Sequence, residues 1–149
     1  MRLVIGLLYG SILFTSCVST KSTLKNVDAN APIPVLVNNR FLIKEVSADK
    51  KYGYDPDYPV NLFYSSATND TLNVVRFFNS ITGPKGETLQ YRRVSTCCPF
   101  PTQRHPMGAG LIDLYEVQYE GLKQPITLYL NIYETSTLYA PQGFLPKPM

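Results

Sequence analysis

The chain has 149 residues, of which 44% are hydrophobic and 12% aromatic, and its formal net charge is +3 at pH 7. This content supports one packed domain, and it excludes both a disordered chain and a second domain of ordinary size. The charge is too small to form the basic surface that nucleic-acid binding requires, so no nucleic-acid partner is expected. The 12 prolines and 9 glycines favour turns and short elements over long helices.

The first seventeen residues resemble the export signal of a bacterial lipoprotein. Arg2 is followed by an apolar run over residues 3–14 and then by the small residues Thr15 and Ser16, directly before Cys17. The run is too short to span a bilayer as a helix. An uncleaved helix is the alternative, and the two glycines and the absence of a polar face argue against it. We therefore expect residues 1–16 to be removed as a signal peptide and Cys17 to carry a lipid.

Residues 17–33 are interpreted as the lipidated cysteine and a flexible tether. Residues 18–30 are rich in Ser, Thr, Lys and Asn and contain few apolar side chains, which is typical of an unstructured linker. Residues 34–149 are then expected to form a single globular domain.

The first half of this domain is predicted to contain short strands and one helix. β-branched and aromatic residues predict strands at 35–37, 40–46 and 60–64. A helix is predicted over residues 71–81, after a cap within 69–71 and before the stop at Gly83 and Pro84. Five apolar residues fall along one side of this helix: Val74, Val75, Phe77, Phe78 and Ile81. A strand remains the alternative, because these residue types also favour sheet.

The second half is predicted to be mostly strand, at residues 88–96, 111–119 and 125–133. The turn at 120–123 predicts that the last two strands pair antiparallel. Residues 98–101 are expected to leave the sheet, because proline lacks an N–H donor. The tail at 140–149 is expected to be an irregular arm. Together these elements predict an α+β fold with a mostly antiparallel sheet of five or six strands and one short helix.

Two adjacent cysteines, Cys97 and Cys98, are the main chemical clue in the folded part. Neighbouring Cα atoms lie about 3.8 Å apart, below the usual disulfide range of about 4.4–6.8 Å, so a bridge between them would be strained and easily reduced. With His105 and Met107 they could hold Cu(I) or Zn(II), although adjacent side chains diverge. Thiol catalysis with His105 as base and Asp113 as orienter, redox work, and a purely structural role remain alternatives. No cofactor is expected.

A loop rich in tyrosine and aspartate is a candidate binding site. Its aromatic faces and carboxylates could contact a glycan or calcium, and the residues concerned are Tyr52, Tyr54, Asp55, Asp57 and Tyr58. A rigid turn set by Pro56 and Pro59 is the structural alternative.

The arginine pair Arg92 and Arg93 could contact phosphate groups. Adjacent residues of a strand point to opposite faces, so the two side chains are expected to diverge. The simpler interpretation is that one or both are solvated.

Four segments resemble a family of small Bacteroidota lipoproteins: residues 52–59 (YGYDPDYP), 97–102 (CCPFPT), 107–110 (MGAG) and 128–134 (LYLNIYE). Members of that family are often labelled 2-dehydro-3-deoxyphosphooctonate aldolase. Enzymes of that name resemble a TIM barrel, which needs about 250 residues and eight strand-helix units, more than residues 17–149 can supply. The resemblance implies an outer-membrane lipoprotein, and the absence of acidic residues at 18–21 favours the periplasmic face.

The sequence therefore predicts a non-catalytic interaction or structural module of the cell envelope. It would be held at the membrane by its lipid anchor and would bind an envelope protein or a glycan through loops at one sheet edge, around residues 52–58 and 97–110. The alternative is a thiol-redox or metal-binding lipoprotein that uses Cys97 and Cys98. An aldolase is the least supported class.

Overall fold

The computed structural model describes residues 21–64 and 70–149. The signal peptide and Cys17 therefore lie outside the described residues, as does Asn69 of the predicted helix cap. No helix within the described ranges has the length and apolar character needed to cross a membrane.

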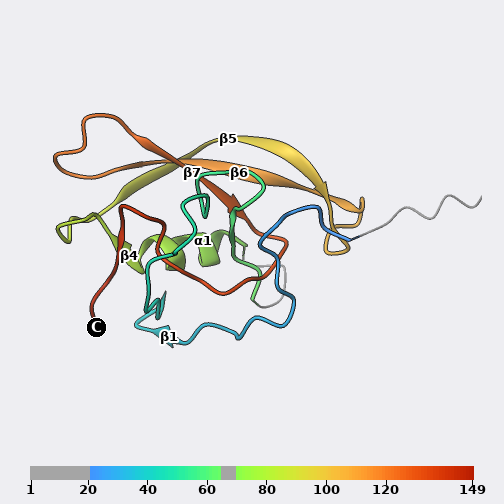
Figure 1. Ribbon diagram of the computed structural model, residues 1–149, viewed down its shortest axis with the longest axis horizontal. Helices are drawn as coiled ribbons and strands as arrows, with labels where there is room; N and C mark the ends of the chain where they lie inside the picture. The colour runs from blue at the N-terminus through green and yellow to red at the C-terminus, as the bar shows by residue number, and fades with distance from the viewer. Residues whose placement is uncertain (1–20, 65–69) are drawn as a thin grey trace, which may run out of the picture.

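A four-stranded sheet forms one layer of the domain, and helix α1 lies beneath one of its faces (Figure 1). Its strands, in spatial order, are β3 (Val60–Asn61), β7 (Ile126–Asn131), β6 (Ala109–Gln118) and β5 (Gln90–Pro101). The predicted antiparallel pairing of the last two strands is confirmed, because β6 and β7 pair with Tyr115 opposite Leu128. The domain is small, mostly strand, mainly antiparallel in its pairing and carries one short helix, which confirms the predicted fold class.

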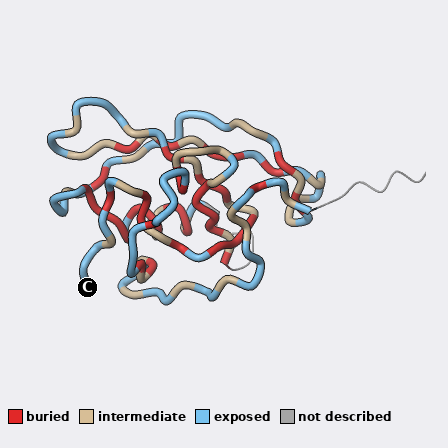
Figure 2. Tube along the Cα trace, in the orientation of Figure 1, coloured by how far each residue is buried: buried red, intermediate tan, exposed pale blue. Residues whose placement is uncertain are grey.

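The main hydrophobic core lies between this sheet and helix α1 (Asp70–Phe78), where Figure 2 shows the buried residues concentrated. Val74, Phe77 and Phe78 of the helix are buried, and the ring of Phe78 stacks on Tyr91 of β5 with 4.0 Å between centroids. The prediction of a helix rather than a strand is therefore confirmed. The helix ends at Phe78, before the predicted end at residue 81.

Two small two-stranded sheets extend the domain. β1 (Leu36–Val37) and β2 (Arg40–Phe41) are joined by Asn38 and Asn39, whose φ angles of 49° and 58° suit a tight hairpin turn. β4 (Ile81–Thr82) pairs antiparallel with β8 (Leu145–Pro146) near the C-terminus. The expectation of an irregular C-terminal arm was wrong. The tail is packed into the domain, because Ala140 and Phe144 are fully buried.

Strand β5 runs through the prolines at which it was expected to end. The register shifts between Cys97 and Phe100, after which Phe100 pairs with Gly110 and Pro101 with Ala109. The prediction that residues 98–101 leave the sheet was therefore wrong. β5 is an edge strand with a bulge at this point, and both features accommodate a residue that lacks an N–H donor.

The described part of the predicted tether, from Lys21 onward, is packed against the domain. Leu24 is buried together with Phe100 and Ile112 on the sheet face turned away from α1, and these three residues form a second, smaller core. The backbone N–H of Lys25 donates to Asp57 O at 2.8 Å, and that of Asp28 donates to Thr135 O at 2.8 Å. A composition typical of a linker did not reveal this packing, because one buried leucine and a few backbone hydrogen bonds are enough to order the segment.

Candidate functional site

The outer edge of β5 is the most open backbone surface of the sheet. β5 stands at the end of the strand order, and no described residue outside the sheet makes a backbone hydrogen bond to residues 90–96. Five consecutive residues, 92–96, are exposed. Val94 has no partner in the ladder, because the register shifts between Arg93 and Ser95. A bulge in an edge strand twists the edge and limits unspecific pairing with other chains.

The two arginines of this edge point to opposite faces, as the alternation predicted. Arg92 Nη2 lies 2.5 Å from the Glu116 carboxylate, and Arg93 Nη2 lies 2.7 Å from the Asp113 carboxylate. Glu116 and Asp113 lie on opposite faces of β6, since they are three residues apart on one strand. Both arginine side chains keep a large exposed fraction, 75% for Arg92 and 54% for Arg93. They are ion-paired rather than simply solvated, and they still present positive charge along the edge.

Two clefts lie against β5, and one of them extends across β6 toward Pro125. One has a volume of about 390 Å³ and is lined by Gln90, Tyr91, Arg92, Glu116, Gln118 and Pro125. The other has a volume of about 340 Å³ and is lined by Arg93, Val94, Ser95 and Thr96. Together they place a recess beside each half of the edge.

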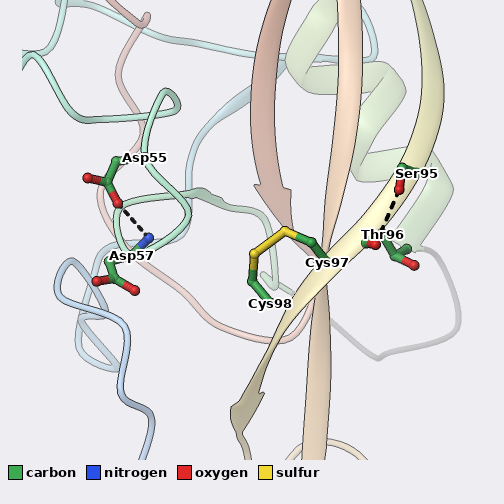
Figure 3. The surroundings of a disulfide bond; sticks show 6 residues. All are labelled: Asp55, Asp57, Ser95, Thr96, Cys97 and Cys98. Atoms are coloured by element: carbon green, nitrogen blue, oxygen red, sulfur yellow. Dashed lines mark hydrogen bonds between the residues drawn. A yellow bond between two sulfur atoms is a disulfide. The ribbon is translucent and has the colours of Figure 1, made fainter.

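The adjacent cysteines are bonded to each other as a disulfide, with Cα atoms 3.7 Å apart. Both residues are half-buried and pack against the second core. Cys98 has a φ of 55°, a conformation that side chains with a Cβ rarely adopt. Figure 3 shows the disulfide on β5, next to Ser95 and Thr96, with the turn of Asp55 and Asp57 on its other side. In this bonded form neither sulfur is a free thiolate for metal binding or nucleophilic attack.

The structure does not assemble the predicted metal cluster. His105 and Met107 lie in the loop at 102–108 between β5 and β6, where Nδ1 of His105 accepts a hydrogen bond from Met107 N at 3.2 Å. The Met107 side chain is directed into solvent and is 84% exposed. Within residues 21–64 and 70–149, no group of three or more His, Cys, Asp or Glu is arranged to hold a metal ion. Asp113, the predicted orienter of His105, instead accepts hydrogen bonds from Arg93.

The tyrosines of the predicted binding loop make their described contacts with other residues of the domain. Tyr52 is buried, and its hydroxyl oxygen accepts a hydrogen bond from Tyr139 N at 3.3 Å. The Tyr54 hydroxyl donates to Gln142 O, and burial raises the pKa of Tyr54 to about 12. Tyr58 faces the Lys51 ammonium at 4.9 Å.

The carboxylates of this loop also have a local structural role. Asp55 Oδ1 accepts a hydrogen bond from Asp57 N at 2.9 Å, as in a turn closed by an aspartate side chain. These contacts match the rigid-turn alternative better than a glycan or calcium site.

The two predicted binding loops do not share one sheet edge. Gly53 of the tyrosine loop accepts a hydrogen bond from Tyr129 N at 2.8 Å, which places the loop beside β7 on the β3 side of the sheet. β5 and the loop at 102–108 lie two strands away. The tyrosine loop and the cysteines therefore attach to different strands of the sheet, although the turn of Asp55 and Asp57 lies across from the disulfide (Figure 3).

A buried asparagine network went unpredicted. Asn61 and Asn131 are fully buried, and Asn131 Nδ2 donates to Asn61 Oδ1 at 2.8 Å. Asn61 Nδ2 in turn donates to Asn26 Oδ1 at 3.1 Å and to Ser136 Oγ at 3.3 Å. The network joins three separate parts of the chain and satisfies its own polar groups, so it stabilises the fold rather than binding a ligand.

Among the sequence candidates, the cysteine pair and the arginine pair Arg92 and Arg93 lie on β5, the open edge strand. The edge itself was missed, although charged residues within a strand and a nearby proline are signals of an edge position. No protein-family model, curated protein sequence or solved structure matches this chain.

Proposed function

We propose that this protein is an outer-membrane lipoprotein facing the periplasm, and that its domain binds an extended segment of a protein partner along the outer edge of β5. The membrane part of the proposal is supported by the N-terminal sequence, where an apolar run and two small residues precede Cys17. The binding part is supported by the geometry of β5. The module is proposed to be non-catalytic.

The exposed edge with a cleft beside each half is the observation that carries the binding proposal. An added strand gains affinity from backbone hydrogen bonds to an open edge, and it gains specificity when its side chains enter neighbouring pockets. β5 offers both, because residues 92–96 are exposed and the two clefts lie beside residues 90–92 and 93–96.

The charge of the edge indicates what the partner segment carries. Arg92 and Arg93 keep most of their exposed area while they pair with Glu116 and Asp113. A second carboxylate can therefore approach each guanidinium from the solvent side. The partner segment is an extended peptide with acidic residues.

The lipid anchor is tested by replacing Cys17. The Cys17→Ser chain should incorporate no fatty acid and should leave the outer-membrane fraction, whereas a Ser16→Ala chain should behave as the native protein. Fatty-acid labelling and membrane fractionation measure both. Retention of labelled lipid by Cys17→Ser would contradict the membrane part of the proposal.

The edge is tested by photo-crosslinking in the cells that make the protein. A photoreactive amino acid at Val94 should give a discrete product with one partner, mapped by mass spectrometry to one acidic segment. The same group at Thr127, an exposed position on the interior strand β7, should not give that product. Equal products from both positions, or a product of two copies of this chain, would contradict the proposal.

Proline substitutions provide the matched control. Successive N–H groups of a strand point to opposite edges, so one of Ser95→Pro and Thr96→Pro removes an outward donor while the other breaks a bond to β6. The variant that keeps the native melting temperature identifies the outward position. This variant should lose the Val94 crosslink, and its persistence would show that the partner does not pair with the β5 edge.

A further inference from the structure

The disulfide lies at the point where the regular part of β5 ends. Thr96 pairs with Asp113 and Cys97 with Ile112, but the next paired residue of β5 is Phe100, opposite Gly110. Cys98 and Pro99 therefore stand opposite one residue of β6, which is the arrangement of a bulge. The disulfide joins Cys97, the last paired residue before the bulge, to Cys98, the first residue within it.

We propose that Cys97 and Cys98 form a redox site, in which reduction of the disulfide by a dithiol donor loosens the bulge and weakens partner binding along β5. The part that concerns binding rests on the proposed function, whereas the redox reaction and the change in β5 do not. Both cysteines are half-buried on an edge strand, so a donor can reach them from the solvent side.

The reaction is a thiol-disulfide exchange. A thiolate of the donor attacks one sulfur of the pair, which breaks the bond between Cys97 and Cys98 and forms a mixed disulfide. The second thiol of the donor then attacks the mixed disulfide. The donor leaves as an oxidised disulfide, and its two electrons and two protons remain on Cys97 and Cys98 as two thiols.

Reduction changes the local backbone because the bridge holds together two side chains that a strand would separate. Consecutive side chains of a strand point to opposite faces, but the bridge keeps both sulfurs on one side. Cys98 adopts its positive φ of 55° within this ring. A residue with a Cβ prefers negative φ, so Cys98 is expected to leave this conformation once the bridge opens.

Reduction of the disulfide is expected to alter the proposed binding edge in two ways, through the backbone of β5 and through side-chain packing. Cys97 and Cys98 pack against Leu24, Phe100 and Ile112. Two free thiols cannot keep the positions of one compact disulfide, so these contacts must rearrange. Thr96, at the end of the exposed run, is directly bonded to Cys97 and shares any shift of the bulge.

The first experiment compares the oxidised and reduced full chain, purified in detergent. Native protein treated with dithiothreitol should lose the disulfide and gain two more alkyl groups than untreated protein on reaction with iodoacetamide. Hydrogen exchange of peptides covering residues 95–100 should then become at least about tenfold faster, while peptides from β7 stay unchanged. The Cys97→Ser, Cys98→Ser double variant should exchange like the reduced protein under both conditions, and Ser95→Ala should keep the redox response.

Two results would overturn the redox site. The first is that dithiothreitol at any concentration adds no alkyl groups to native protein, although it adds two to denatured protein. The second is that exchange in residues 95–100 is identical in the oxidised, reduced and double-serine forms.

The effect of reduction on partner binding is measured by the yield of the Val94 crosslink. The yield should fall at least about fivefold in the reduced and double-serine forms relative to the oxidised form. A yield that is equal in all forms, together with a faster exchange on reduction, would overturn the regulation and leave both the proposed function and the redox site standing. Absence of the product in every form would overturn the proposed function, while alkylation and exchange would still decide the redox site.

Discussion

At the residue scale, buried amide side chains determine how the chain segments join. Asn61 connects β3 to Asn26 of the N-terminal segment and to Ser136, and Asn131 connects the same site to β7. Tyr64 adds a hydrogen bond from its hydroxyl to Asn61 O at 2.9 Å. Each group is costly to bury alone and is stabilising only with its partners present.

We predict that Asn61→Ala lowers the free energy of unfolding by about 2–4 kcal/mol, because it leaves donors and acceptors of Asn26, Asn131 and Ser136 without partners in the interior. Urea unfolding followed by circular dichroism measures the change. Asn79→Ala, at an exposed position after α1, is the matched control and should change stability by less than about 0.5 kcal/mol. Equal effects of the two substitutions would show that the network contributes little.

At the element scale, the hairpin of β5 and β6 depends on close packing at one glycine. A Cβ at Gly110 would lie 2.7 Å from Cδ2 of Tyr133 and 2.8 Å from Cζ of Phe100, closer than carbon atoms can approach. The glycine lets these two rings cover the end of the hairpin, where β5 resumes pairing after its bulge. The rings and the glycine thus define the geometry on which the exposed edge depends.

We predict that Gly110→Ala destabilises the domain by about 1–3 kcal/mol, because aromatic rings must move to admit the methyl group. Thermal unfolding monitors the effect. Shortening one ring should relieve it, so adding Phe100→Leu to Gly110→Ala should cost less than the sum of the two single changes. Strict additivity would mean that the predicted contact with Phe100 does not occur.

At the scale of the whole molecule, the sheet contributes to two hydrophobic cores. The main core includes helix α1, and the second core lies near the end of β5 and β6, where Leu24 packs on Ile112 and Phe100 and where the segment that begins at Lys21 runs in Figure 1. This segment also contacts the tyrosine loop through the hydrogen bond from Lys25 to Asp57. A segment of linker-like composition thereby becomes part of the domain.

We predict that Leu24→Ala lowers the free energy of unfolding by about 2–4 kcal/mol, through lost burial and the cavity that it leaves. Lys25→Ala, at the exposed neighbouring position, should have little effect. Chemical denaturation of both variants measures the difference. A Leu24→Ala chain as stable as Lys25→Ala would show that the segment does not contribute to the core.

The stability of the whole domain should fall in alkaline solution. Burial raises the pKa of Tyr52 and Tyr64 well above the ordinary value near 10, and it raises the pKa of Tyr54 to about 12. Above pH 10 the unfolded chain releases these phenol protons while the folded chain keeps them. The stabilisation is therefore complete below pH 10 and decreases as the pH rises toward the folded pKa values.

Each of the buried residues Tyr52 and Tyr64 should reduce the free energy of unfolding by about 1.4 kcal/mol per pH unit in this range. Urea unfolding at pH 8, 9, 10 and 11 measures the slope, and Tyr52→Phe should make it shallower above pH 10. Parallel slopes for the native and Tyr52→Phe chains would contradict a buried neutral phenol at this position.

The sequence by itself determined the elements whose signals are local. The alternation of residues 111–119 and 125–133 around a short turn predicted the β6 and β7 pair, and apolar residues at helical spacing predicted α1. The adjacent cysteines could be recognised as a chemical site, because covalent adjacency alone restricts their geometry. Each of these features depends on residues close together in the chain.

Only the tertiary structure decided how distant segments come together. It showed that β5 is an edge strand that continues past Pro99, that the tail is held by β4 and Phe144, and that the N-terminal segment covers the second core. It also showed no metal-binding group among the described residues and joined the asparagines into one network. These arrangements depend on burial and hydrogen bonds between residues far apart in sequence, and no local pattern encodes which distant surface will provide the partner.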